Sequence, residues 1–119
     1  MRRLLRSIGY AAQGFGFAVR TQRNMKIHLG AATAVSLLAA LLGLSRLEWV
    51  LLIGACIAVI AMELVNTAIE CIVNLVKPDP HPMAKVAKDT AAAAVLVCAA
   101  GAAAIGLIVL LPPLIKLVH

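Results

Sequence analysis

The polar residues that could do chemistry lie on one face of a predicted helix. They recur at positions i, i+3, i+4, i+7 and i+11 and are Glu63, Asn66, Thr67, Glu70 and Asn74, here called the polar stripe. This spacing follows the 3.6-residue period of an α-helix, so the five side chains share a face. Two carboxylates, amides and a hydroxyl on one face could hold a divalent cation and also supply a general base.

The polar stripe interrupts a segment that is otherwise apolar. A glutamate near hydrocarbon costs on the order of 2–3 kcal/mol to insert, so such residues usually have a function. A seam that only joins helices would need no more than Asn66 and Thr67. The two glutamates therefore favour a functional site.

A lysine and an aspartate, Lys88 and Asp89, begin the next apolar segment after a short proline-rich loop. The short loop predicts that they lie near the end of the polar stripe. Lys88 could meet a phosphate as a point charge, or it could be an interfacial lysine. Carboxylates, a lysine and a base at membrane depth suit phosphoryl transfer, which depends on positioning and charge neutralisation. The sequence has no GxxxxGK[ST] loop and no HRD or DFG motif.

Composition indicates the elements that must position these residues. Of the 119 residues, 63% are hydrophobic and 13% are charged, more apolar surface than a soluble domain of this size can hide. Three segments are long enough to span a bilayer, namely residues 27–44, 48–76 and 84–111. We expect the last to end at Pro112 and Pro113. Residues 1–24 mix basic and apolar residues, which predicts an amphipathic helix at the membrane surface.

The fold class that follows is an all-α integral membrane protein with one domain. Nine of the eleven lysines and arginines lie before residue 27 or between residues 77 and 88. Basic residues collect on the cytoplasmic side of membrane proteins, so the N-terminus is expected in the cytoplasm. Because the charges flank apolar runs, topology explains the net charge of +6 better than nucleic-acid binding does.

Two motifs resemble those of the prokaryotic diacylglycerol kinase family. They are the run ELVNTAIE from Glu63 to Glu70 and the run AKVAKD from Ala84 to Asp89. The run RNMKIH at residues 23–28 and the Glu48-Trp49 turn are similar to the undecaprenol kinase branch of that family. The likeness covers nearly the whole chain. It implies a homotrimer in the bacterial cell membrane, with active sites between subunits. It also implies ATP with Mg²⁺ as the donor, and undecaprenol or diacylglycerol as the acceptor.

The resemblance implies a role for each matching residue. Glu63 matches the catalytic carboxylate that activates the lipid hydroxyl, and Asn66 lies close to the reacting groups. Glu70 matches a ligand of the metal. The nucleotide contacts implied in addition are Arg3, Tyr10, His81, Lys88 and Asp89.

Two positions depart from the family pattern. Many members place a metal-binding Glu where this chain has Gln22. An amide oxygen can still bind Mg²⁺, but it brings no charge. The family motif also continues I-E-x-x-V-D, and Asn74 replaces that Asp. Neither change affects Glu63, Asn66, Glu70, Lys88 or Asp89, so we expect activity.

Two other functions are compatible with part of the sequence. A small proton-coupled transporter or channel could use Glu63 and Glu70 as relay carboxylates. A structural assembly protein could be held together by the Ala- and Gly-rich third span. The transporter would not explain why Lys88 and Asp89 begin that span.

Overall fold

Four α-helices form nearly the whole chain in the computed structural model, which describes residues 1–119. They are α1 (Arg2–Thr21), α2 (Arg23–Leu42), α3 (Arg46–Val76) and α4 (Pro82–Val118). Three of them, α2, α3 and α4, are long and apolar enough to cross a membrane. The predicted all-helical architecture with three spanning helices is confirmed at this level.

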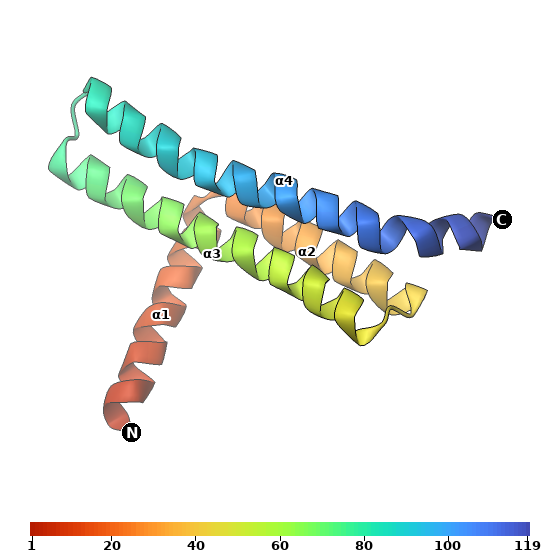
Figure 1. The fold of residues 1–119 in the computed structure, drawn as a ribbon. Coiled ribbons are helices and arrows are strands. Elements are labelled where there is room, and N and C mark those ends of the chain that lie inside the picture. The colour runs from red at the N-terminus through yellow and green to blue at the C-terminus, as the bar shows by residue number, and fades with distance from the viewer.

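The three apolar helices pack together, and α1 leaves them at a steep angle (Figure 1). The α3 and α4 helices run side by side in opposite directions and make the most extensive contact in the molecule. The α1 helix touches α2 and α3 but not α4. Its single buried residue is Ala18, so only its C-terminal end is tied to the bundle.

Local chemistry explains where α2 ends and α3 begins. The α2 helix stops at Gly43, which has a φ of 68°, the left-handed conformation that glycine adopts most easily. A capping box then starts α3. The Ser45 hydroxyl accepts from the Glu48 backbone N–H at 3.2 Å, and the Ser45 backbone N–H donates to Glu48 Oε1 at 3.0 Å. These two bonds satisfy backbone groups that a helix end leaves free.

The α4 helix begins with a different cap. His81 Nδ1 accepts a hydrogen bond from the Met83 backbone N–H at 3.1 Å, and Pro82 occupies the first helical turn. Proline is favoured there because its missing N–H would have no partner in the helix. The loop between α3 and α4 is short, as expected, and consists of residues 77–81.

The prediction that Pro112 and Pro113 end the last helix is wrong. Both lie inside α4, which continues to Val118 and bends near its C-terminal end (Figure 1). Each proline removes one backbone N–H donor, which weakens a helix without always stopping it. Packing favours continuation here, because Leu114, one residue further on, packs against the main apolar cluster. That cluster consists of Ala39, Leu52, Val109 and Leu110.

Most apolar side chains face outward. Only 13 of the 119 residues are buried, and residues such as Leu41, Leu96 and Ile108 are largely exposed. An apolar surface of this extent is expected where lipid is the solvent. It is therefore consistent with the spans that the helix lengths indicate.

Candidate active site

The polar stripe runs along α3 from a buried end to an exposed one. Glu63, Asn66 and Thr67 are the only buried polar residues in the protein. Glu70 is half-buried and Asn74 is exposed. The 31 residues of α3 span about 46 Å at 1.5 Å each, against a hydrocarbon core of about 30 Å. The α3 helix is therefore longer than that core is thick, so part of it lies beyond the hydrocarbon.

Glu70 is held by two amide side chains. Gln22 Nε2 donates to Glu70 Oε2 at 3.1 Å, and Asn66 Nδ2 donates to Glu70 Oε1 at 3.3 Å. Gln22 is the extended residue between α1 and α2, and it lies 48 positions away in the sequence. Three residues predicted from the sequence to belong to the site thus meet at one carboxylate.

The same group of side chains offers oxygen atoms to a hard cation. Asn66 Oδ1 is buried and has no hydrogen-bond partner. Beside it lie the Glu70 carboxylate and the Gln22 amide, whose oxygen could also serve. No group of three or more His, Cys, Asp and Glu side chains is arranged so that it could hold a metal ion. A cation held here would therefore need further oxygen ligands from a bound phosphate, as Mg²⁺ commonly takes.

Glu63 is the most deeply buried charged residue, with 1% of its surface exposed. Neither of its carboxylate oxygens has a hydrogen-bond partner. The Thr67 hydroxyl donates to the Glu63 backbone carbonyl at 2.8 Å and so does not reach the carboxylate. A buried carboxylate without donors is costly, which marks Glu63 as a residue kept for a use.

A histidine that is not part of the polar stripe lies beside Glu63. His28 Nε2, on α2, is 3.7 Å from Glu63 Oε2. In the sequence, His28 is marked only as a polar residue within an apolar segment. Its partner could not be read from the sequence, because the contact joins two helices.

An apolar groove lies between α2, α3 and α4 and has a volume of about 520 Å³. Its lining includes Ala32, Val35, Val59, Ala99, Gly106 and Leu110. His28 is the one lining residue that is ionisable near neutral pH, and it lies at the end of the groove nearest Glu63. The end of the groove at His28 therefore lies close to the buried carboxylate.

A polar hollow of about 560 Å³ lies at the loop between α3 and α4. It is lined by charged and polar residues that include Lys77, Asp79, His81, Lys85, Lys88 and Asp89. The structure thus brings together His81, Lys88 and Asp89, three of the residues predicted to contact nucleotide. Lys85 Nζ donates to Asp89 Oδ2 on the exposed surface, so Asp89 already has one partner.

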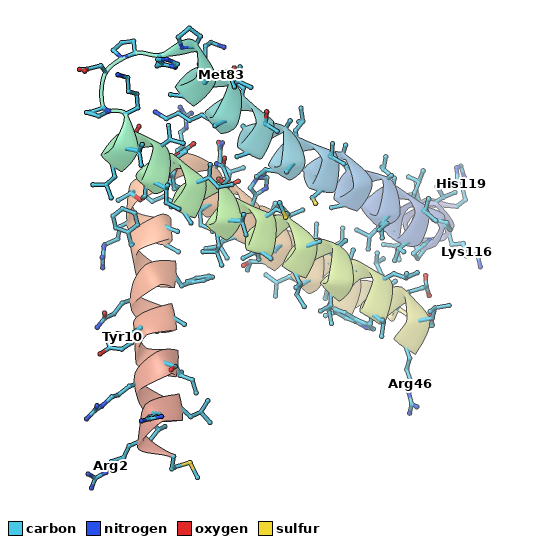
Figure 2. The ribbon with its side chains drawn as sticks, turned by 60° about the vertical axis from the view of Figure 1, so that its left-hand side comes forward. Arg2, Tyr10, Arg46, Met83, Lys116 and His119 are labelled. Carbon is cyan, nitrogen blue, oxygen red and sulfur yellow. The ribbon has the colours of Figure 1, made fainter.

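Two other predicted nucleotide contacts do not join this hollow. Arg3 and Tyr10 are exposed on α1, and Figure 2 shows Tyr10 far from Met83 at the start of α4. No residue of α1 contacts α4. A single chain therefore does not bring Arg3 or Tyr10 to Lys88.

Comparison with known proteins identifies the family of this chain. A model of the family described as prokaryotic diacylglycerol kinase matches residues 9–110, most of the chain. The chain belongs to this family. The resemblance stated from the sequence motifs is confirmed, and family membership makes the chain a lipid kinase. The transporter and the structural protein considered above are not supported.

Individual relatives of this lipid kinase agree with the family. It is 40% identical to the undecaprenol kinase of Bacillus subtilis over 114 residues, which are 96% of this chain and 93% of that protein. It is 44% identical to a diacylglycerol kinase of Synechocystis over 115 residues, 96% of this chain and 66% of that protein. A diacylglycerol kinase of Pseudomonas aeruginosa is 35% identical over 94 residues, 79% of this chain and 76% of that protein. With its three apolar helices, the kinase is a bacterial membrane protein.

Proposed function

We propose that this lipid kinase transfers the γ-phosphoryl group of ATP to the hydroxyl of undecaprenol at the cytoplasmic face of the membrane. Diacylglycerol is the second candidate acceptor. The observation that carries the proposal is the position of Glu63, buried and without hydrogen-bond partners where the apolar groove approaches the polar stripe. Likeness to an undecaprenol kinase over almost the whole of both chains supports the choice of acceptor.

The apolar groove supports a lipid acceptor. Its walls come from three helices and are almost entirely aliphatic, so hydrocarbon can replace solvent or bulk lipid there without loss of hydrogen bonds. With its chain in the groove, the acceptor presents its hydroxyl near His28 and Glu63. The alcohol is thereby held next to the only buried carboxylate.

The chemistry assigned to Glu63 is general-base catalysis. Its carboxylate takes the proton of the acceptor hydroxyl while the alcohol oxygen forms a bond to the γ-phosphorus. The bond from that phosphorus to the bridging oxygen breaks, and ADP leaves with the electron pair. Asn66 lies one helical turn from Glu63 and orients the reacting groups.

The polar hollow supports a nucleotide at the end of α3. Lys88 offers a positive charge to the phosphates, while Asp89 and His81 lie in the same hollow. Phosphoryl transfer needs such positioning and charge neutralisation more than it needs covalent catalysis. Asp89 must exchange or share its contact with Lys85 when the nucleotide binds.

Glu70, Asn66 and Gln22 are the residues proposed to hold Mg²⁺. The unpartnered Asn66 oxygen and the Glu70 carboxylate fit an oxygen-preferring cation. Mg²⁺ bound with ATP would neutralise charge on the phosphates. Gln22 would contribute an amide where many family members contribute a carboxylate, so this chain would supply less negative charge to the metal.

A homotrimer is proposed because one chain leaves the nucleotide residues apart. Arg3 and Tyr10 of one subunit could reach the hollow of a neighbouring subunit, since α1 extends away from its own bundle (Figure 1). Exposed apolar residues of α1, such as Leu4, Leu5 and Ile8, support its placement at the headgroup level, with the basic side chains toward lipid phosphates. The excess of basic residues on this side supports a cytoplasmic N-terminus.

The proposal is tested with purified protein in mixed micelles. With Mg²⁺ and labelled ATP, we expect label to enter undecaprenol and, at a lower kcat/KM, diacylglycerol. Glu63→Gln should lower kcat at least about 100-fold, the usual range for loss of a general base. Glu48→Gln, the same change at the other end of α3, should keep a wild-type rate. Absence of label in both alcohols, or full activity of Glu63→Gln, would refute the proposal.

A further inference from the structure

The basic side chain within 4 Å of the Glu63 carboxylate is that of His28. The imidazole Nε2 lies 3.7 Å from Glu63 Oε2, and both carboxylate oxygens are otherwise without partners. The two nearest polar residues on α3 are already engaged. Thr67 donates to a backbone carbonyl, and the Asn66 amide donates to Glu70. Neither of them therefore donates a hydrogen bond to the Glu63 carboxylate.

His28 also lies between the apolar groove and the buried carboxylate of Glu63. Its side chain is 22% exposed, whereas that of Glu63 is 1% exposed. One edge of the ring faces Glu63, and the side chain contributes to the wall of the apolar groove. His28 therefore lies both in the wall of the groove and beside the Glu63 carboxylate.

The distance of 3.7 Å is longer than a hydrogen bond, which has a donor–acceptor distance of 2.7–3.2 Å. A movement of about 0.5–1 Å closes the gap, and catalytic hydrogen bonds often tighten in this way when substrate binds. A carboxylate with two free oxygens and no neighbour to hold it can rotate about its side-chain torsions. A donor on one oxygen fixes its orientation and leaves the other oxygen free.

We infer that His28 is the positioning residue of the catalytic base: its Nε2–H donates to Glu63 Oε2, so that Oε1 faces the acceptor hydroxyl. This inference rests on the proposed function. The hydroxyl proton passes to Oε1 as the alcohol oxygen bonds to the γ-phosphorus, and ADP leaves with the bridging oxygen. His28 keeps its own proton throughout. It acts on the reaction through Glu63 and takes no part in bond making.

The matched pair His28→Gln and His28→Met tests the role. Gln and Met have nearly the same length and shape, but only Gln carries an N–H donor near the position of Nε2. We expect His28→Met to lower kcat about 10- to 100-fold, with KM for the lipid alcohol within about twofold of wild type. His28→Gln should recover kcat to within about fivefold of wild type. His119→Met, at the exposed C-terminus, is the control and should match wild type.

Each other outcome overturns the inference. Equal rates for the Gln and Met variants, whether high or low, would mean that the N–H donor does not matter. A rise in KM with kcat unchanged would mean that His28 binds the acceptor instead of positioning Glu63. Melting temperatures of both variants in the same detergent show whether they are folded. If both variants are destabilised to the same extent, a difference between their kcat values still reports the N–H donor. If the wild-type protein phosphorylates neither alcohol, the proposed function fails, whereas an active wild type with indifferent variants refutes only the role of His28.

Discussion

Replacing Gln22 with glutamate tests the contact that joins the α1–α2 connection to the polar stripe. Gln22 Nε2 donates to Glu70 Oε2 at 3.1 Å. In Gln22→Glu, a carboxylate oxygen replaces the donor, and a favourable hydrogen bond becomes a repulsion between two negative charges. The substitution also restores the residue type that many members of the family have at this position.

The size of the effect follows from the geometry. Two unit charges about 4 Å apart interact by about 4 kcal/mol at an effective dielectric constant of 20. Gln22 and Glu70 are both partly exposed, so screening reduces this to about 1–2 kcal/mol. For a chain of this length, such a loss lowers the melting temperature by on the order of 5–10 °C.

Magnesium should remove or reverse the loss of melting temperature caused by Gln22→Glu. A cation between the two carboxylates removes their repulsion and gains a second charged ligand. We expect the Mg²⁺ concentration for half-maximal activity to fall about tenfold, since 1.4 kcal/mol corresponds to a factor of ten. The Gln22→Glu protein should therefore melt below wild type in EDTA and at or above wild type in millimolar Mg²⁺.

The assay is thermal unfolding in detergent, with EDTA or Mg²⁺ and without nucleotide, alongside a Mg²⁺ titration of activity. Gln13→Glu places the same charge change on an exposed position of α1 and should alter neither quantity. If Gln22→Glu melts like wild type in EDTA and has an unchanged Mg²⁺ requirement, Gln22 and Glu70 are not neighbours in the working enzyme. The assignment of Glu70 to the metal would then lose its structural support.

Two further predictions concern the groove and a helix cap. Gly106 lines the apolar groove and Gly101 does not, and a Cβ at either meets nothing within 4 Å. Gly106→Leu should raise KM for the lipid alcohol about tenfold, since the new side chain displaces roughly two methylene groups of the lipid at about 0.8 kcal/mol each. Gly101→Leu should leave KM unchanged, and equal KM values for the two variants would place the acceptor elsewhere. Ser45→Ala should lower the free energy of unfolding by about 1 kcal/mol in a denaturant titration, without changing kcat, because it removes the α3 cap. An unchanged unfolding midpoint would show that the cap is not formed in the membrane protein.

The features that the sequence predicts well are those that depend on local pattern. Hydropathy identifies the three spans, and helical spacing alone places Glu63, Asn66 and Glu70 on one face of α3. Buried polar residues are found on this face and nowhere else in the chain. The motifs also identify the family correctly, because they bring several residue types at fixed spacing.

The features that it predicts poorly depend on contacts between helices. The sequence marks Gln22 as a departure from the family's metal ligand, but its hydrogen bond to Glu70 depends on how α1, α2 and α3 meet. The neighbour of Glu63 on α2, His28, was missed for the same reason. The helix end expected at Pro112 was wrong, because packing of residues beyond the prolines outweighs a local propensity to stop. Residues on α1 predicted to bind nucleotide cannot be joined to the site from one chain.

The break between α1 and α2 has a mechanical consequence. Gln22 adopts an extended backbone conformation there, with φ −106° and ψ 114°, and its side chain holds Glu70. The hinge of the surface helix and the amide that steadies a carboxylate of the stripe are thus the same residue. A rotation of the α1 helix about this joint would strain or release the bond to Glu70, so the orientation of this helix on the membrane is coupled to the site through the Gln22 side chain.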